Sequence, residues 1–188
     1  MEQDAVKYMG GQENTAVFDK WVVVGHCPTL NYSHKRLSCN PLINHNRNFV
    51  IIDGALDTWH AGQLNALIIC DGMFSYQSDD NLPRHHVTKG QQASGGDLGI
   101  VWTGEAEVEL VTKGEEFSFY RHVETGKIIQ LANRTIDIME NGALRCSLDT
   151  DYFLPANAGD EIRVVFTYSD RIFAKMDGII GYYRISHE

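Results

Sequence analysis

The stretch VVVGHCPTLNY at residues 22–32 places an apolar, β-branched run directly before a glycine, a histidine and, two residues later, a proline. Such a run predicts a short strand that is covered on both faces. Gly25 leaves room for close approach, and Pro28 stiffens the turn that carries His26. A rigid element fixes metal distances well, so His26 is a candidate metal ligand. The competing interpretation is a turn histidine that hydrogen-bonds to a carbonyl.

Two further apolar runs follow, FVIID at residues 49–53 and LNALIIC at residues 64–70. Turn-rich segments separate the three runs, so the expected order is strand, histidine-bearing loop, strand, turn, strand. α/β proteins usually place their sites at the carboxyl ends of strands. We nevertheless expect His60 to be an exposed loop residue, and the alternative is that Gly25, Asp53 and His60 line one cleft.

The composition and the apolar pattern of the sequence change near residue 80. Residues 77–99 lose their apolar periodicity and accumulate glycine, serine, glutamine and aspartate, which predicts a linker or a long surface loop. We accordingly divide the chain into residues 1–80, a linker at 81–104 and a β region at 105–188. A short helix over residues 2–9, ended by two glycines, is expected before the first strand.

The β region contains a weak internal repeat. KGEEFSFYRHVETGKIIQLAN, which begins at Lys113, aligns with AGDEIRVVFTYSDRIFAKMDG, which begins at Ala158. Each copy has an acidic turn, a strand, a polar turn and a second strand. The segments 105–141 and 144–188 are therefore candidates for two similar units, although any two hairpins with acidic turns share this pattern.

Composition narrows the class of protein. The 188 residues are 43% apolar and contain no run of about 18 apolar residues, so we expect a folded, cytoplasmic protein without a membrane span. Residues 1–99 hold 7 basic against 10 acidic side chains and residues 100–188 hold 9 against 15, which gives net charges of −3 and −6. Because nucleic-acid binders need a basic stripe, nucleic acid is not an expected partner.

The chain has four widely spread cysteines, Cys27, Cys39, Cys70 and Cys146. That spacing favours reduced thiols over a disulfide framework. The first two lie close in sequence to His34 and His45, but no pair has the short spacing of a structural zinc site. Zinc binding is therefore not the favoured interpretation of these residues.

The segments GHCPT, NPLIN, FVIIDG and GQLNALII, in this order, resemble the C-terminal end of calcineurin-like metallophosphoesterases of the protein-phosphatase and diadenosine-tetraphosphatase type. The second half, with Gly-Asp-Glu before a long strand and Gly-Tyr-Tyr near its end, is similar to bacterial SH3-like domains. The resemblance implies a mainly β (α+β) fold, in which the C-terminal strands of an α/β sandwich precede one or two small SH3-like β barrels. It also implies two divalent metals, Mn, Fe or Zn, in the complete enzyme, with His26 as a ligand of one of them.

Most of that family's metal ligands are not in this sequence. The family carries them in Gly-Asp-x-His, Gly-Asp-x-x-Asp-Arg-Gly and Gly-Asn-His-Glu, whereas Gly96-Asp97 and Gly159-Asp160 here continue as Leu-Gly and Glu-Ile. One histidine cannot position two metal ions about 3.5–4 Å apart. We therefore expect this chain alone to bind no metal stably and to be inactive, and we assign no catalytic residue within it.

The resemblance implies that the complete enzyme is a phosphoric ester hydrolase, in which a metal-bridged hydroxide attacks a phosphorylated substrate. The alternatives are a non-catalytic binding or regulatory module that uses the SH3-like barrels, and a truncated gene product with no role of its own. The expected partner is a separate N-terminal catalytic half or a second copy. The strands at residues 21–24 and 49–53 would lack neighbours, and exposed strand edges pair readily.

Overall fold

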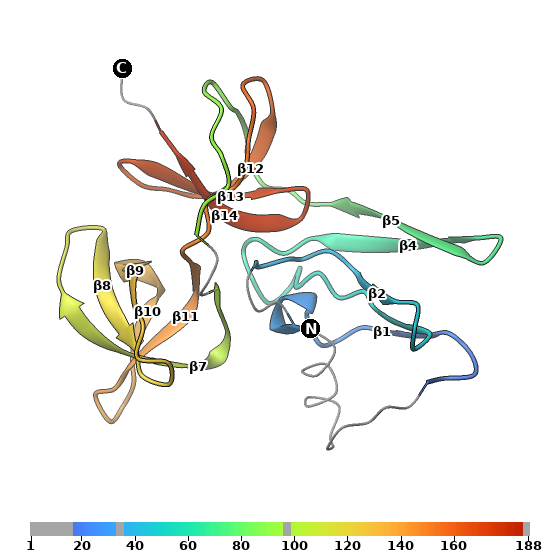
Figure 1. Cartoon of the computed structure of the whole chain (residues 1–188), viewed down its shortest axis with the longest axis horizontal. Helices are drawn as coiled ribbons and strands as arrows, with labels where there is room; N and C mark the ends of the chain where they lie inside the picture. Colours follow the sequence, from blue (N-terminus) through green and yellow to red (C-terminus); the bar gives the residue numbers. More distant parts are fainter. Residues whose placement is uncertain (1–16, 33–35, 96–98, 186–188) are drawn as a thin grey trace. The chain divides into compact units, whose positions relative to one another are not determined.

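The computed structural model describes residues 17–32, 36–95 and 99–185, with the backbone alone at 99–105 (Figure 1). The helix expected at residues 2–9 lies outside the described residues. The described chain is mainly β, and its helical segments are two short 3-10 helices, η1 (Thr29–Tyr32) and η2 (Asn133–Thr135). The chain divides into two compact units, the first Met1–Ser33, Ser38–Leu82 and Asp177–Ile179, and the second His34–Leu37, Pro83–Met176 and Ile180–Glu188.

The first unit is built on a three-stranded sheet in the order β1-β3-β2. β1 (Val22–Val24) runs parallel to β3 (Phe49–Ile51), and β2 (Leu42–Asn44) runs antiparallel to β3. All three residues of β3 are buried, as expected for a central apolar strand. The strands predicted at 21–24 and 49–53 are thus present, although each is one or two residues shorter.

A separate two-stranded antiparallel ribbon completes the first unit (Figure 1). Its strands are β4 (Leu64–Cys70) and β5 (Met73–Asp79), and β4 has the bounds predicted from LNALIIC. One face of the ribbon carries Phe74, whose ring centroid lies 4.0 Å from that of Trp21. This face is therefore the one that packs within the unit.

The second unit contains two sheets. One has the strand order β10-β11-β7-β8-β9, and the other has the order β14-β13-β12-β6. Their bounds are β6 (Arg84–His86), β7 (Gly99–Thr112), β8 (Phe117–His122), β9 (Ile128–Ala132), β10 (Ile136–Ile138), β11 (Leu144–Thr150), β12 (Glu161–Thr167), β13 (Arg171–Met176) and β14 (Ile179–Arg184). The five-stranded sheet supplies a buried cluster of Ala106, Val108, Tyr120, Ile129, Leu131 and Cys146.

Residues 81–104, expected to be a linker, contain ordered strands. β6 pairs antiparallel with β12, and β7 already begins at Gly99. β6 is Arg-His-His and carries no apolar pattern, so its order comes from the partner strand and not from its own sequence. The boundaries of the three expected segments, 1–80, 81–104 and 105–188, stay predictions.

Both copies of the predicted repeat form antiparallel hairpins, β8–β9 and β12–β13. The two hairpins belong to different sheets, and neither sheet closes into a barrel within the described strands. The SH3-like assignment therefore stays a prediction, while the mainly β character is observed. Within the described residues, no helix has the length and apolar character that a membrane crossing requires.

Candidate functional site

His26 lies immediately after β1, and its side chain is exposed. Its backbone has a φ of 71°, in the left-handed region, which non-glycine residues other than asparagine, aspartate and histidine seldom enter. A Cβ added at the neighbouring Gly25 would meet no atom within 4 Å, so nothing crowds this turn. The structure thus presents the histidine at the carboxyl end of a strand, with open space beside it.

Asp53 follows β3, the parallel neighbour of β1. Two backbone hydrogen bonds join the segments that leave these strands. The Ile52 N–H donates to the Val24 carbonyl at 3.0 Å, and the Thr29 N–H donates to the Asp53 carbonyl at 2.8 Å. The structure therefore brings Asp53 and the histidine turn to the same edge of the sheet, although the Asp53 Oδ1 is engaged locally by the Ala55 N–H at 2.8 Å.

A closed loop connects β3 to β4. The Gln63 N–H donates to the Gly54 carbonyl, and the Gly62 N–H donates to the Trp59 carbonyl, each at 2.9 Å. A Cβ at Gly54 would lie 2.1 Å from the Gln63 carbonyl oxygen, and one at Gly62 would lie 2.2 Å from that of Ala55. Glycine is required at both positions because the backbones approach so closely. The base of this loop is therefore firmly closed.

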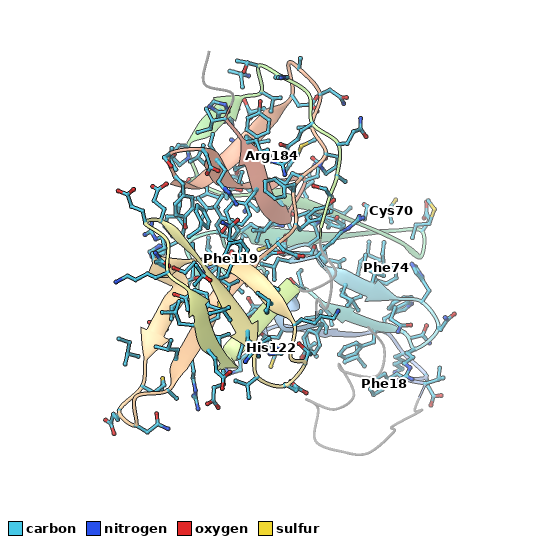
Figure 2. The ribbon with its side chains drawn as sticks, turned by 60° about the vertical axis from the view of Figure 1, so that its left-hand side comes forward. Phe18, Cys70, Phe74, Phe119, His122 and Arg184 are labelled. Atoms are coloured by element: carbon cyan, nitrogen blue, oxygen red, sulfur yellow. The ribbon has the colours of Figure 1, made fainter. Side chains whose placement is uncertain are left out.

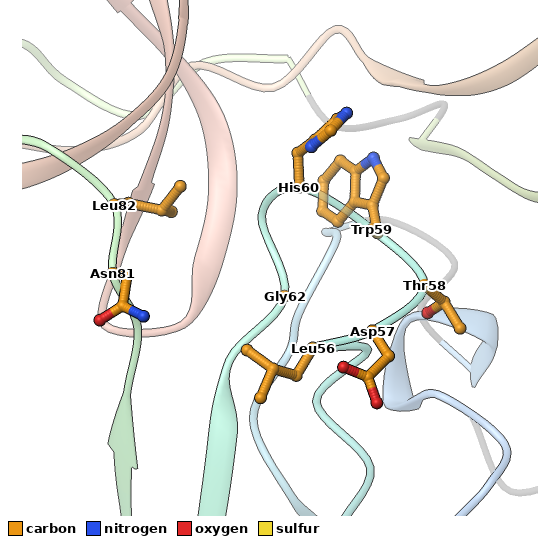
Figure 3. Close-up of a pocket in the computed structure, with 8 residues that line it drawn as sticks. All are labelled: Leu56, Asp57, Thr58, Trp59, His60, Gly62, Asn81 and Leu82. Carbon is orange, nitrogen blue, oxygen red and sulfur yellow. The ribbon is translucent and has the colours of Figure 1, made fainter.

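The loop forms part of the wall of a recess of about 540 Å³ (Figure 3). The lining residues are Leu56, Asp57, Thr58, Trp59, His60, Gly62, Asn81 and Leu82. His60 is exposed and lines this recess, whereas Gly25 and Asp53 are not among the lining residues. The single cleft considered as the alternative for these three residues is not this recess. Trp59, which the sequence analysis did not single out, is its main aromatic side chain.

Within the part of the chain that the structure describes, no three His, Cys, Asp or Glu side chains gather into a group that could hold a metal ion. Cys39 is fully buried, and its Sγ donates to a backbone carbonyl at 3.5 Å. His45 packs edge-on against Trp21, with 5.2 Å between ring centroids, and His34 lies outside the described residues. The described residues therefore form no two-metal centre, and the metal-binding role of His26 stays a prediction.

The sequence interpretation missed a buried carboxylate in β11. The side chain of Asp149 is completely buried. Its Oδ1 accepts the Thr150 N–H and the Tyr182 hydroxyl, both at 2.7 Å, and its Oδ2 accepts the Ala132 N–H at 2.7 Å and the Thr135 hydroxyl at 3.2 Å. Burial raises the pKa of Asp149 to about 6, against the opposing effect of these hydrogen bonds. Since Tyr182 lies in β14, this carboxyl joins the two sheets of the second unit.

The hydrogen-bond partners of Asp149 can also accommodate its carboxyl group in the protonated form. The Thr135 hydroxyl also lies 2.8 Å from the Ala132 carbonyl oxygen, to which it can donate. In that arrangement its oxygen is available to accept a proton donated by Asp149. No polar pattern in Ser-Leu-Asp-Thr-Asp distinguishes Asp149 from an ordinary strand-end aspartate, so the sequence contained no signal for this network.

Arginine side chains stack on several aromatic rings of the second unit. The Arg171 guanidinium lies 4.2 Å from the ring centre of Phe117, and that of Arg184, labelled in Figure 2, lies 4.0 Å from the ring centre of Phe153. Arg171 also forms an ion pair with Asp170 at 2.8 Å. Because the Arg171 guanidinium is already paired and stacked, it contributes to packing between strands.

One face of the β4–β5 ribbon is apolar and exposed. Leu64, Ile68 and Met73 are 61%, 40% and 70% exposed. The strand register places them on the same face as Cys70, which Figure 2 shows at the tip of the ribbon. β4 carries no charged residue, and the charged residue that β5 adds to this face is Asp79, opposite Leu64. Native sheets usually protect exposed strands with charges or prolines, so this face is a surface suited to association.

No protein family, no curated protein and no solved structure matches this chain. The resemblance to metallophosphoesterases and to SH3-like domains therefore rests on the sequence motifs alone.

Proposed function

We propose that this chain contributes one metal-binding histidine, His26, to a metal-dependent phosphoesterase whose other ligands lie outside it. The observation that supports the proposal is the shared edge at which the parallel strands β1 and β3 deliver His26 and Asp53. Ligands commonly bind at the carboxyl ends of parallel strands. An exposed histidine in a left-handed conformation at that edge fits the role of a ligand better than that of a packing residue.

The small size of the three-stranded sheet also favours the idea that a protein segment from outside this chain completes the sheet. Parallel strands occur mostly in larger sheets that are covered on both faces. Here the parallel pair belongs to a sheet of three strands, and Val23 of the edge strand β1 is 45% exposed. A further protein segment against this sheet would cover Val23 and bring additional ligands for Mn, Fe or Zn to the same edge. The described residues do not hold the metals by themselves, so we assign no step of the reaction to this chain.

The second unit fits the role of an accessory module in the same proposal. The hairpins β8–β9 and β12–β13 support two similar β units, for which an SH3-like fold is our proposal. The four cysteines all lie among the described residues and form no disulfide, which agrees with a reducing, cytoplasmic compartment.

A non-catalytic binding module is the second candidate, and the exposed apolar face of the β4–β5 ribbon favours it. The strand β4 itself carries no charge, and Asp79 of β5, opposite Leu64, lies at the end of this face away from Ile68 and Met73, where a second copy of this acidic chain would pack. In this alternative, the occupant of the ribbon face is a second copy of the chain, and His26 has no metal partner.

Addition of Mn²⁺ to the isotope-labelled chain tests the role of His26, because even weak and transient binding of the ion to one histidine broadens the resonances of nearby amides. We expect broadening centred on Gly25, His26 and Cys27, which is lost in His26→Ala and kept in His86→Ala, a change at an exposed histidine of β6. Broadening that is confined to exposed aspartates such as Asp71, and that is unchanged in His26→Ala, contradicts the proposal. Co-expression with a polypeptide of the same genome that carries Gly-Asp-x-His and Gly-Asn-His-Glu is expected to give aryl-phosphate hydrolysis that falls in His26→Ala.

A further inference from the structure

The geometry points to the recess beside the β3–β4 loop as a binding site for a small organic cation, such as a trimethylammonium or guanidinium group. Its volume of about 540 Å³ lies within the range of small-molecule sites, about 300–1,000 Å³. The site uses none of the residues proposed to bind a metal, so it is independent of the role of His26.

Trp59 supplies the aromatic surface of this recess. Its side chain is half-buried and that of His60 is exposed, and Figure 3 shows the two rings at one end of the recess. The negative face of an indole attracts cations more strongly than the other aromatic side chains do. Leu56 and Leu82 add apolar surface to the wall. A ligand with an apolar body and a positive charge matches this lining.

Acidic side chains predominate around the recess. Asp57 is exposed, and it is the one Asp, Glu, Lys or Arg among the eight lining residues. On the opposite wall, Leu82 follows two further aspartates, and its N–H donates to Oδ1 of Asp80 at 3.1 Å. The described residues of the first unit hold 7 acidic against 2 basic side chains, a net charge of −5. Such a field concentrates cations and disfavours anions.

The wall that carries Trp59 is ordered without a ligand. The carbonyl of Ala55 accepts the N–H of Thr58 at 3.2 Å and the N–H of Trp59 at 3.1 Å. Together with the closed base at Gly54 and Gly62, these bonds fix the backbone of the loop. Binding therefore does not require the loop to become ordered, which removes one of the usual costs of association.

The test compares two ligands of the same shape in NMR titrations of the full chain. Choline carries the positive charge, and 3,3-dimethylbutan-1-ol replaces its nitrogen by carbon. We expect choline to shift the Trp59 indole N–H and the amides of residues 56–60 in a saturable manner. The neutral alcohol is expected to bind roughly two- to fivefold more weakly, as a cation–aromatic contact at an exposed site implies.

Two variants and one control complete the test. Asp57→Asn keeps the shape and removes the charge, so it is expected to weaken choline binding by a similar factor and to leave binding of the alcohol unchanged. Trp59→Leu is expected to reduce the difference between the two ligands to the part that Asp57 contributes. Asp71→Asn, at the β4–β5 turn, is the matched control and should bind choline as the unmodified chain does. Well-dispersed amide spectra show that each variant is folded.

The proposal is overturned if choline and the neutral alcohol bind the recess with equal affinity. It is also overturned if choline shifts only residues outside the recess, or if Asp57→Asn binds choline as tightly as the unmodified chain. None of these outcomes depends on metal binding at His26, so failure here leaves the phosphoesterase proposal standing.

Discussion

Asp149 is expected to make the second unit less stable as the pH rises. Burial raises the pKa of this carboxyl from 3.8 to about 6. A group whose pKa is higher in the folded protein contributes its full stability below the unfolded pKa and loses it as the pH rises through the folded pKa. At about 1.36 kcal/mol for each pKa unit, the change from 3.8 to about 6 corresponds to a loss of about 3 kcal/mol, of which about 1.4 kcal/mol falls between about pH 5 and pH 8.

The substitution Asp149→Asn isolates this contribution because the amide does not titrate. Its NH₂ group must replace one of two oxygens that accept backbone N–H groups at 2.7 Å, from Ala132 and from Thr150. Two donors then face each other, so the variant is expected to be less stable by about 1–3 kcal/mol at neutral pH. The informative quantity is the stability of the unmodified protein minus that of the variant, which should decrease by about 1.4 kcal/mol from about pH 5 to pH 8.

Urea unfolding at several pH values, followed through the amide resonances of Ala132 and Thr150, measures this difference locally. Glu116→Gln is the matched control with the opposite sign. Hydrogen bonds from Ser169 lower the pKa of Glu116, so its contribution should grow as the pH rises. A difference for Asp149→Asn that is constant or increases with pH would refute the reasoning, as would amide shifts that titrate near the ordinary aspartate pKa.

Three further predictions concern the first unit. With manganese present, the purified chain is expected to hydrolyse no aryl phosphate, and turnover that disappears in His26→Ala would contradict this. The apolar ribbon face predicts self-association that rises with concentration in sedimentation experiments. Ile68→Lys should weaken it roughly tenfold and Gln77→Lys on the same face much less, and a monomer at every concentration would exclude it. Gly62→Ala should lower the free energy of unfolding by about 1–3 kcal/mol, because its Cβ would lie 2.2 Å from a carbonyl oxygen, and an equal loss in the uncrowded Gly25→Ala would argue against this cause.

A strand with a strong apolar pattern could be predicted from the sequence. A strand whose conformation depends on pairing with a distant strand could not. LNALIIC is seven residues long, uncharged and followed by Asp-Gly, and β4 has those bounds. β6 consists of Arg84, His85 and His86, and its strand conformation depends on pairing with β12, which lies far along the chain. Local periodicity does not carry that information.

In the candidate site, too, the features set by local sequence could be predicted, and the features set by strand pairing could not. The place of His26 after a strand followed from the apolar run before it, whereas its closeness to Asp53 depends on the parallel pairing of β1 with β3. The recess joins a loop near Trp59 to Asn81, some twenty residues later, in a segment that looks like the start of a linker. A tryptophan beside a histidine in a glycine-flanked loop was the available signal for the recess, and it indicated one wall only.

The β3–β4 loop has two parts with different sequence requirements. The residues at its closed base must stay the same, whereas the side chains between them can change. Gly54 and Gly62 have no space for a Cβ, so any other residue there would force the two loop ends apart. The side chains at residues 56–60 meet no such restriction, and most of them are exposed. Exchange of these five residues would therefore give a new recess on an unchanged frame. The loop residues can therefore be exchanged as a unit, and selection or protein engineering could change the ligand of the recess without redesigning the sheet that carries the loop.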